Sequence, residues 1–416
     1  MSRTLQPVRG TQDLLPAAMR RHRAVVDTAR LHALRFGYEE IATPIFEFTE
    51  VFARPIGETT DIVMKEMYSF ADKGGEEVTL RPENTAGVVR AVLANGLTQS
   101  LPLRFFYHGP MFRYERPQKG RFRQFHQIGV ELIGVKEPQG DVEVIALGAD
   151  ILAALGVLER SELRLNTLGD AESRGAYRDA LVKYFTQHAH KLSEDSRKRL
   201  ERNPLRILDS KDQADIALSA AAPHFEDYLT PPSREFFNRV RDGLDVLGIR
   251  YKLDPRLVRG LDYYTHTAFE FVTAELGSQG AVLAGGRYDG LMGVMGGPET
   301  PGVGWAAGIE RLALMIAEPE PAPRPIALVP IGAEAEALAL KLAQELRRGG
   351  FAVDLAYSGN LQKRMRRADK IKARAAVILG EDELKRGQAA VRDLDAGTQT
   401  DVPLTTLKDR LATFRG

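Results

Sequence analysis

Two apolar-rich runs flank a basic loop between Arg104 and Gly134, and their side chains alternate in character. In the second run, one face of a strand would carry Ile128, Val130 and Leu132, and the other Phe125, Gln127, Gly129 and Glu131. Pro117 and Gly120 break regular structure between the runs, so the pattern predicts strand, loop, strand. The polar face fits either the solvated side of an ordinary antiparallel strand or the wall of a cavity. The arginines of the loop favour the cavity.

A helix and a hairpin are predicted upstream of this segment. The pattern from Ala17 to Phe36 predicts a helix, of which roughly one face is formed by Met19, Val26, Ala29 and Ala33. Two strand-like runs within residues 61–81 are separated by a Lys-Gly-Gly turn sequence. Glu83 and Thr85 then precede a helical pattern, where each could serve as a helix cap or as a ligand contact.

Strand and helix patterns recur on both sides of a charged stretch. Residues 141–156 predict a helix and the following residues a strand, while strand alternation resumes at Tyr251 and runs through VRGLDYYTHTAFEFVT. Between Asp170 and about Arg250, charged helical runs are interrupted by prolines, which predicts a helical insertion at about 170–250 within the first domain. Further on, GVGWAAGIERLAL predicts a strand that leads into a helix carrying Arg311.

A proline-rich segment at 318–325 separates two domains of different character. Four prolines in eight residues favour an extended linker, so we expect one domain at 1–320 and another at 326–416. In the second domain strands and helices alternate as β-α-β-α-β, which predicts a parallel sheet covered by helices. Its middle helical segment carries Lys363, Arg364, Arg366, Arg367, Lys370, Lys372 and Arg374. Such a segment fits either a nucleic-acid contact or a solvated helix face.

Composition excludes several classes of protein. The 416 residues contain no cysteine, which excludes disulfides, thiolate metal sites and a cysteine nucleophile. The net charge of +1 means that nucleic acid would be bound through local basic patches. The N-terminus is polar and no window approaches about 18 apolar residues, so we expect neither secretion nor membrane insertion, and a cytoplasmic location.

Familiar catalytic motifs do not occur. The chain has no G-x-x-x-x-G-K-[ST], H-E-x-x-H or G-x-S-x-G, and His108 and His126 lack metal-ligand spacing, so no metal site is predicted. Arginines, carboxylates, tyrosines and glycines on predicted strands remain. Arginine clamps phosphate with a planar fork of donors, and phosphoryl chemistry relies mostly on positioning and charge stabilisation.

Five separated motifs, in the expected order, resemble histidyl-tRNA synthetases, a family of class II aminoacyl-tRNA synthetases. FGYEEIATPIFEFTEVFARPIG resembles motif 1 of the class, FRYERPQKGRFRQFHQIGVELIG motif 2, and GVGWAAGIERLAL motif 3. VRGLDYYT (258–265) and AGGRYDGL (284–291) narrow the resemblance to the histidine family, and RGTQDLLP and LRPENTAG are similar to it too. The resemblance covers essentially the whole chain. It implies an α+β fold with a class II synthetase-type antiparallel sheet, helices, and a C-terminal α/β anticodon-binding domain.

The resemblance also implies a role for each matching residue. The implied histidine-binding residues are Glu83, Thr85, Gln127, Glu131, Arg259, Tyr264 and Tyr288. Glu83, Thr85 and Gln127 would bind the α-amino end, whereas Glu131 and Tyr264 would read the imidazole nitrogens. The implied ATP-binding residues are Arg113, Glu115, Arg121 and Arg311. Arg259 and Arg113 are the implied catalytic residues, with Arg259 at the α-phosphate.

The implied enzyme is a histidine–tRNA ligase. It would convert L-histidine and ATP, accompanied by Mg²⁺, to histidyl-adenylate, and then transfer histidine to the 3′ end of a histidine-specific tRNA. The motif 1 resemblance implies a homodimer. Two alternatives share the core: a histidine-sensing regulatory subunit of ATP phosphoribosyltransferase, and an RNA-binding or polymerase-accessory relative. Such regulatory paralogues usually lack the C-terminal domain and site arginines, whereas Arg113, Arg259 and Arg311 are all present here.

Overall fold

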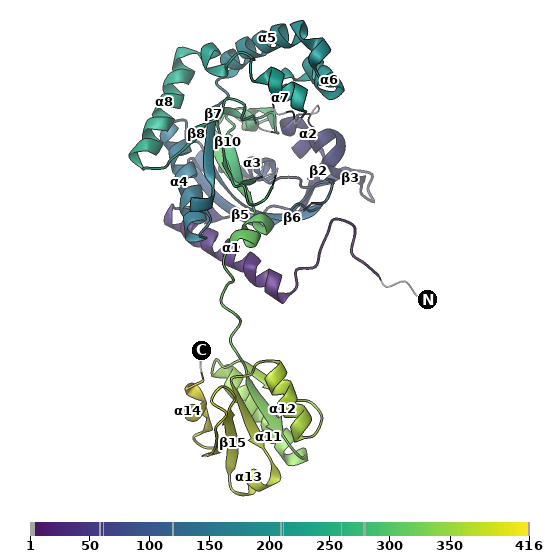
Figure 1. Cartoon of the computed structure of the whole chain (residues 1–416), viewed down its shortest axis with the longest axis vertical. Coiled ribbons are helices and arrows are strands. Elements are labelled where there is room, and N and C mark those ends of the chain that lie inside the picture. The colour runs from purple at the N-terminus through teal and green to yellow at the C-terminus, as the bar shows by residue number, and fades with distance from the viewer. Residues whose placement is uncertain are drawn as a thin grey trace. The chain divides into compact units, whose positions relative to one another are not determined.

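The chain forms two compact units, Met1–Pro319 and Glu320–Gly416 (Figure 1). The structure, a computed structural model, describes residues 5–57, 60, 62–118, 120–208, 210, 212–258, 260–277 and 280–414, with the backbone alone for 201–202. Within these residues, no helix has the length and apolar character needed to cross a membrane.

An eight-stranded sheet is the frame of the first unit as far as the structure describes it. In order across the sheet, its strands are β1 (Glu39–Glu40), β5 (Leu103–Phe112), β6 (Gln124–Ile133), β11 (Gly302–Gly308), β10 (Ala281–Arg287), β9 (Thr265–Val272), β7 (Glu162–Thr167) and β8 (Lys252–Leu253). All pairings from β5 across to β7 are antiparallel, and only the short edge strands pair in parallel among the described residues. The predicted antiparallel sheet is therefore confirmed.

Four helices line the apolar core of this sheet. They are α1 (Pro16–Arg35), α4 (Pro138–Ala154), α8 (Pro231–Val246) and α10 (Ile309–Met315). In α1 the buried residues Val25, Ala29 and Ala33 recur every four positions, so the predicted face is confirmed at Ala29 and Ala33, whereas Met19 is exposed. On β6 the alternation holds as predicted, because Ile128, Val130 and Leu132 belong to this core. Gln127 and Glu131 consequently project from the opposite face.

A smaller three-stranded sheet is separate from the large one and is connected to it by a hydrogen bond from Phe112 N–H, at the end of β5, to the carbonyl of Arg81. Its order is β2 (Phe46–Phe48), β4 (Glu77–Leu80) and β3 (Tyr68–Ala71), and nearby lie α2 (Glu50–Ile56), η1 (Ile62–Glu66), α3 (Thr85–Ala94), η2 (Leu97–Ser100) and α9 (Leu291–Val294). The predicted hairpin turn is present, since the Asp72 carboxylate accepts the N–H groups of Gly74 and Glu76. The chain leaves β4 directly toward α3.

Helices fill the stretch between β7 and β8. They are α5 (Ala171–Gln187), α6 (Glu194–Arg202), α7 (Gln213–Ser219) and α8, with the short turns η4 (Ala189–Lys191), η5 (Pro204–Ile207) and η6 (Phe225–Tyr228), while η3 (Leu158–Arg160) precedes β7. Figure 1 shows α5, α6 and α7 grouped at one end of the first unit. Their own apolar core includes Tyr177, Leu181 and Phe225. We call residues 171–246 the helical region; its status as an insertion stays a prediction.

The strand predicted through VRGLDYYTHTAFEFVT is wrong in its first half. β9 begins only at Thr265, because the preceding residues turn. Leu257 N–H bonds to the carbonyl of Asp254, and Asp262 N–H bonds to the carbonyl of Ile56 at the end of α2, not to a neighbouring strand. Residues 260–264 therefore form a loop, which we call the 260–264 loop.

The second unit is a five-stranded sheet flanked by helices. Its strand order is β13 (Val353–Leu355), β12 (Ile326–Pro330), β14 (Ala375–Leu379), β15 (Gln388–Asp393) and β16 (Gln399–Pro403), with helices α11 (Ala333–Arg348), α12 (Leu361–Lys370), α13 (Glu381–Lys385) and α14 (Leu407–Ala412). β13, β12 and β14 are parallel as predicted, but β15 and β16 are antiparallel. The sheet is mixed because a tight turn joins β15 to β16, where Asp393 accepts the N–H groups of Asp395 and Ala396.

Candidate active site

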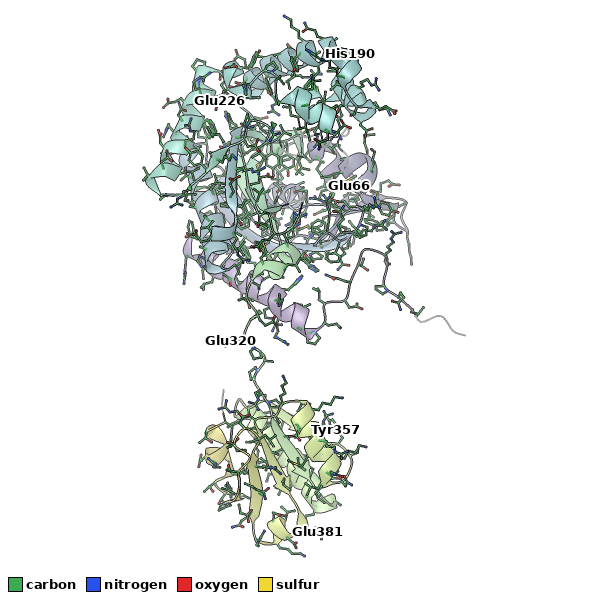
Figure 2. All side chains as sticks on the ribbon, in the orientation of Figure 1. Glu66, His190, Glu226, Glu320, Tyr357 and Glu381 are labelled. Carbon is green, nitrogen blue, oxygen red and sulfur yellow. The ribbon has the colours of Figure 1, made fainter. Side chains whose placement is uncertain are left out.

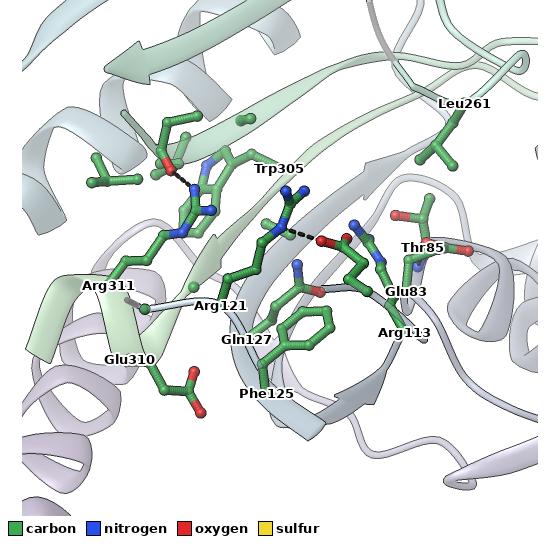
Figure 3. Close-up of a pocket in the computed structure, with 18 of the residues that line it drawn as sticks. Glu83, Thr85, Arg113, Arg121, Phe125, Gln127, Leu261, Trp305, Glu310 and Arg311 are labelled. Atoms are coloured by element: carbon green, nitrogen blue, oxygen red, sulfur yellow. Dashed lines mark hydrogen bonds and ion pairs between the residues drawn. The ribbon is translucent and has the colours of Figure 1, made fainter. Parts of the chain in front are cut away.

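A cavity of about 320 Å³ lies beside the polar face of β6 (Figure 3). Its walls come from the start of α3, the β5–β6 hairpin, the 260–264 loop, β10, β11 and the start of α10. Segments far apart in the sequence thus meet around one space, which we call the substrate pocket.

Glu131 lies beyond the inner wall of the substrate pocket and is fully buried. Its carboxylate accepts hydrogen bonds from the hydroxyls of Thr85 at 2.7 Å, Tyr288 at 2.6 Å and Tyr107 at 3.4 Å. Burial raises the pKa of Glu131 to about 8, and these hydrogen bonds partly oppose the increase. Gly304 on β11 is the register partner of Glu131, and a Cβ there would collide with the carboxylate. A glycine is needed beside this carboxylate.

Glu83 and Thr85 connect the start of α3 to this carboxylate. The Glu83 carboxylate accepts the main-chain N–H groups of Thr85 and Ala86, so it caps α3 while it lines the pocket. Thr85 does not act as the cap; its hydroxyl donates to Glu131. Glu83 therefore caps α3 and Thr85 does not, while the ligand contact of each residue stays a prediction. Burial raises the pKa of Glu83 above its usual range.

Gln127 and Arg113 face the pocket from the β5–β6 hairpin. Gln127 Oε1 is buried, with no hydrogen-bond partner in the part of the chain that the structure describes. A buried amide oxygen without a partner is costly, so it marks a place where a ligand donor would be favourable. Arg113 donates to the carbonyl of Pro82 at 2.8 Å, and its guanidinium lies 5.3 Å from the centre of the Phe125 ring.

Arginines gather at the other end of the pocket. Figure 3 shows Arg121 between Arg311 and Arg113, and Arg121 is paired with Glu115. Arg311 donates to the carbonyl of Ala281 on β10. Burial lowers the pKa of Arg311, and the positive charges of Arg121 and Arg113 lower it further, while Glu115 opposes them. Three arginines against one carboxylate leave an excess of positive charge that suits a polyphosphate.

Glu310 fixes the helix that carries Arg311. Its carboxylate accepts the main-chain N–H of His126 at 2.9 and 3.0 Å and lies 2.8 Å from the His126 ring nitrogen. Figure 3 shows the Glu310 side chain pointing away from the arginines. The possible ligand atoms of His22, His126 and Glu310 lie within 4.8 Å of one another, a group that sequence spacing did not indicate. Glu310 therefore ties the start of α10 to β6.

All residues that line the substrate pocket lie within the part of the chain that matches a known protein family. The profile of the histidyl-tRNA synthetase family matches residues 10–312, and that of an anticodon binding domain matches residues 326–413. A histidine–tRNA ligase of Rhodospirillum rubrum is 61% identical over 411 residues, 99% of each chain. One of Gluconacetobacter diazotrophicus is 58% identical and covers 99% of this chain and 100% of its own. The chain belongs to the histidyl-tRNA synthetase family.

A solved structure agrees with this assignment. The apo histidyl-tRNA synthetase of S. aureus superposes with a TM-score of 0.81 at 36% identity, covering 98% of this chain and 99% of its own. The resemblance to the histidyl-tRNA synthetase family, drawn from five short motifs, is therefore confirmed over nearly the whole chain. The predicted fold class is confirmed with it.

Most residues to which the histidyl-tRNA synthetase resemblance gave a role come together here. The pocket is lined by Glu83, Thr85, Arg113, Glu115, Arg121, Gln127, Tyr264 and Arg311, while Glu131 and Tyr288 lie behind them. Arg259 and Lys119 lie outside the described residues. The individual roles stay predictions.

Some pocket residues were missed from the sequence. Tyr107 bonds to Glu131, and Glu310 and Trp305 line the pocket. Glu310 stands next to Arg311 in GIERLAL, so its place in that motif was an available signal. Tyr107 gave no signal of its own, because it reads as one more aromatic residue in an apolar strand.

Proposed function

We propose that this chain activates L-histidine with ATP, releasing pyrophosphate, and transfers histidine from the adenylate to the 3′ end of its tRNA. Its full-length relatives are histidine–tRNA ligases, so the ligase function predicted from the sequence is confirmed. The observation that carries the two-step proposal is the polarity of the pocket. The hydrogen-bonded, buried carboxylate of Glu131 lies just behind one end of the pocket, and clustered arginines line the other end.

Histidine would bind at the carboxylate end. Glu131 would accept the N–H of the imidazole and Tyr264 would contact the other ring nitrogen, with Tyr288 holding the Glu131 carboxylate. Glu83, Thr85 and Gln127 would hold the α-amino end, since each lines the pocket. Gln127 Oε1, buried without a described partner, supports this role. A site built from buried polar groups rejects analogues lacking the matching donor by roughly 10⁴-fold or more.

ATP would bind at the arginine end. Arg113 and Arg311 would hold its phosphates, and Arg121 and Glu115 would assist them. Arg259 is proposed to stabilise charge at the α-phosphate, on the strength of the VRGLDYYT motif. Mg²⁺ is expected to accompany ATP. Glu115 would be its protein ligand, since Mg²⁺ is commonly held by one or two carboxylates plus substrate phosphates, and the ion would neutralise phosphate charge.

The regulatory-subunit alternative fits this pocket less well. A histidine sensor would need the carboxylate end alone, whereas Arg113, Arg121 and Arg311 line the remainder. The histidyl-tRNA synthetase profile and the anticodon-binding profile both match here. Histidine-dependent exchange of pyrophosphate with ATP, with the other amino acids as controls, tests the proposal. Absence of exchange with histidine, or equal exchange with another amino acid, would overturn it.

tRNA would be bound by the motif 2 loop and by the second unit. Arg116 is exposed in the loop between β5 and β6. In α12, Arg364 is only 5% exposed and bonds to Glu336, so this arginine of the basic helix is structural. Lys363, Arg366 and Lys370 are exposed and remain available for RNA. Tyr357, labelled in Figure 2, is 79% exposed near that helix and offers a ring for stacking.

A fragment ending at Pro319 should separate the two steps. We expect it to retain histidine-dependent pyrophosphate exchange within about threefold of the full chain, because the substrate pocket lies within the first unit. Charging of tRNA should fall by at least about tenfold, because the exposed cations of α12 are lost. Unimpaired charging at several salt concentrations would exclude the second unit from tRNA binding.

We also propose that the chain acts in the cytoplasm and forms a homodimer. The support for the homodimer is an exposed apolar face on the small sheet, where Phe46, Phe48 and Phe70 are each about half exposed, at 58%, 52% and 49%. Phe48, Val78 and Phe70 are register partners, so they share one face. Exposed aromatic clusters of this kind mark interaction surfaces.

Replacing Phe48 and Phe70 together by Glu should convert the dimer to monomers in analytical ultracentrifugation. The reason is that two carboxylates would be buried without partners at the joint surface. Leu340→Glu, at a residue of α11 that is 63% exposed, is the matched control and should leave the mass unchanged. A wild-type monomer, or a double variant that remains dimeric, would contradict this assembly.

A further inference from the structure

A second cavity, of about 240 Å³, lies behind the 260–264 loop. Leu261 and Tyr264 line both this cavity and the substrate pocket, so the loop is a thin wall between them. On the side away from the substrates, the cavity is lined mainly by residues of the helical region, among them Arg174, Asn203 and Arg206. The conformation of the wall therefore depends on what holds its outer side.

Three donors of the helical region bond to the wall. Arg206 in η5 donates to the carbonyl of Gly260 at 2.8 Å. Asn203, just before η5, donates to the Asp262 carboxylate at 3.2 Å, and Arg174 in α5 lies 3.5 Å from the Asp262 carbonyl oxygen. These contacts join segments that are 54 to 88 residues apart in the chain.

The same wall is held on its other flank by the end of α2. Asp262 N–H donates to the carbonyl of Ile56 at 3.1 Å. Gly57 has a φ of 98°, and a Cβ there would collide with the Asp262 carboxylate. Asp262 is thus fitted closely between α2 and Asn203. Burial raises the pKa of Asp262 while Arg206 and Arg174 lower it, so the surrounding arginines favour the carboxylate that Asn203 contacts.

Accurate placement of this wall matters for the reaction. Tyr264 is 7% exposed and lines the substrate pocket, where it is proposed to contact the imidazole. A misplacement of about 1 Å in a substrate-contacting group can cost about 100-fold in rate. The loop has no strand ladder to set its position, since β9 begins at Thr265. Side-chain donors from outside the loop replace that ladder.

We propose that Asn203 and Arg206 are positioning residues for histidine activation: they touch no substrate, but hold the 260–264 loop in its histidine-binding conformation. This inference rests on the proposed function. It gives the helical region a part in the first half-reaction, in addition to any contact with tRNA.

The test compares Arg206→Ala and Asn203→Ala with Arg234→Ala. Arg234 is a matched control because it also lies in the helical region and also donates to a main-chain carbonyl, that of the exposed residue Glu226 labelled in Figure 2, but does not line the second cavity. Pyrophosphate exchange gives kcat and the KM values for histidine and ATP. Isothermal titration calorimetry with histidine alone gives the Kd for histidine directly.

We expect Arg206→Ala to lower kcat/KM for histidine by about 10- to 100-fold and Asn203→Ala by about 5- to 10-fold, with KM for ATP within twofold. Arg206→Lys should recover part of the loss, because lysine can still donate to the Gly260 carbonyl. A loss of folded protein would lower the active fraction and kcat, but it would leave KM for histidine unchanged. An increase in that KM, or in the Kd from calorimetry, therefore separates positioning from stability.

If both variants match Arg234→Ala in KM and Kd for histidine, the inference is wrong. If Arg206→Ala does not fold, Asn203→Ala decides the question, since it removes a single hydrogen bond. A wild-type chain without histidine-dependent exchange would instead overturn the proposed function, whereas an active wild type with unaffected variants overturns only the positioning role.

Discussion

Glu131→Gln should lower kcat/KM for histidine in pyrophosphate exchange by about 10²- to 10³-fold and leave KM for ATP within about threefold. The carboxylate is fully buried, and Thr85 and Tyr288 donate to it at 2.7 and 2.6 Å. An amide in the same place replaces one of the two oxygens that can accept an imidazole N–H, and its NH₂ group would face a hydroxyl that now donates. The expected loss is therefore confined to the amino acid.

Glu143→Gln is the control for this change. Glu143 is a carboxylate of α4 that pairs with Arg104 at 3.1 Å, and it does not line the substrate pocket. Its replacement should leave both KM values unchanged. Equal effects of the two variants on histidine, or an effect of Glu131→Gln on ATP alone, would remove Glu131 from the proposed histidine site.

The pH dependence of unfolding gives a second measure of Glu131. Burial raises its pKa from 4.5 to about 8, so the ionised carboxyl is disfavoured in the folded chain. The protonated carboxyl therefore contributes its full stabilisation of the folded chain below pH 4.5, and this stabilisation is lost progressively as pH rises from 4.5 toward 8. At about 1.4 kcal/mol per pKa unit, the free energy of unfolding should fall by a few kcal/mol across that window, relative to Glu131→Gln. Parallel curves for the two proteins would show that the carboxyl has an ordinary pKa.

Local sequence pattern was enough for most of the secondary structure. Apolar residues at every second position of β6, and at every fourth of α1, report directly which side meets the core. It failed where a contact distant in sequence decides the conformation. VRGLDYYT alternates like a strand, but the carbonyl of Ile56 and the donors of the helical region hold residues 260–264 as a loop. No local signal carries that information.

The motifs indicated which segments form the site, but they did not indicate which of their side chains face the pocket. In AGGRYDGL, Arg287 is fully buried and pairs with Asp141, which anchors the end of β10 to α4. The next residue, Tyr288, points to Glu131 instead. Adjacent residues thus have structural and pocket-facing positions, because successive side chains leave an extended backbone on opposite sides. Only the strand register, with Gly302 beside the Tyr288 ring and Gly304 beside the Glu131 carboxylate, decides between the two positions.

The same limit applies to the basic helix of the second unit. The sequence shows its cations but not their partners. Arg364 bonds to Glu336, and Arg367 bonds to Asp354 through two hydrogen bonds. Some of the cations that the sequence offered for RNA binding therefore stabilise the fold instead. Charge counting along a sequence overstates a binding surface wherever such pairs form.

Arg311→Ala should lower kcat/KM for ATP by about 10²- to 10³-fold, while the Kd for histidine measured by calorimetry stays within about threefold. Arg311 lines the arginine end of the pocket, where its loss removes a charged donor from the proposed phosphate site. Arg311→Lys should recover only a small part, because a lysine offers a point charge in place of the planar fork. Arg21→Ala is the control, since Arg21, like Arg311, donates to a main-chain carbonyl, that of Ala313 in α10, without lining the substrate pocket.

Stability should move in the opposite direction from activity. Burial and the neighbouring cations Arg121 and Arg113 lower the pKa of Arg311, so its charge is disfavoured in the pocket without ATP. Removing it relieves this repulsion, and we expect a Tm for Arg311→Ala no lower than that of the wild type. ATP should raise the Tm of the wild type and not that of the variant. A variant with a lowered Tm that ATP still raises as much as in the wild type would show that Arg311 supports the fold through its bond to Ala281, and that ATP phosphates are held elsewhere.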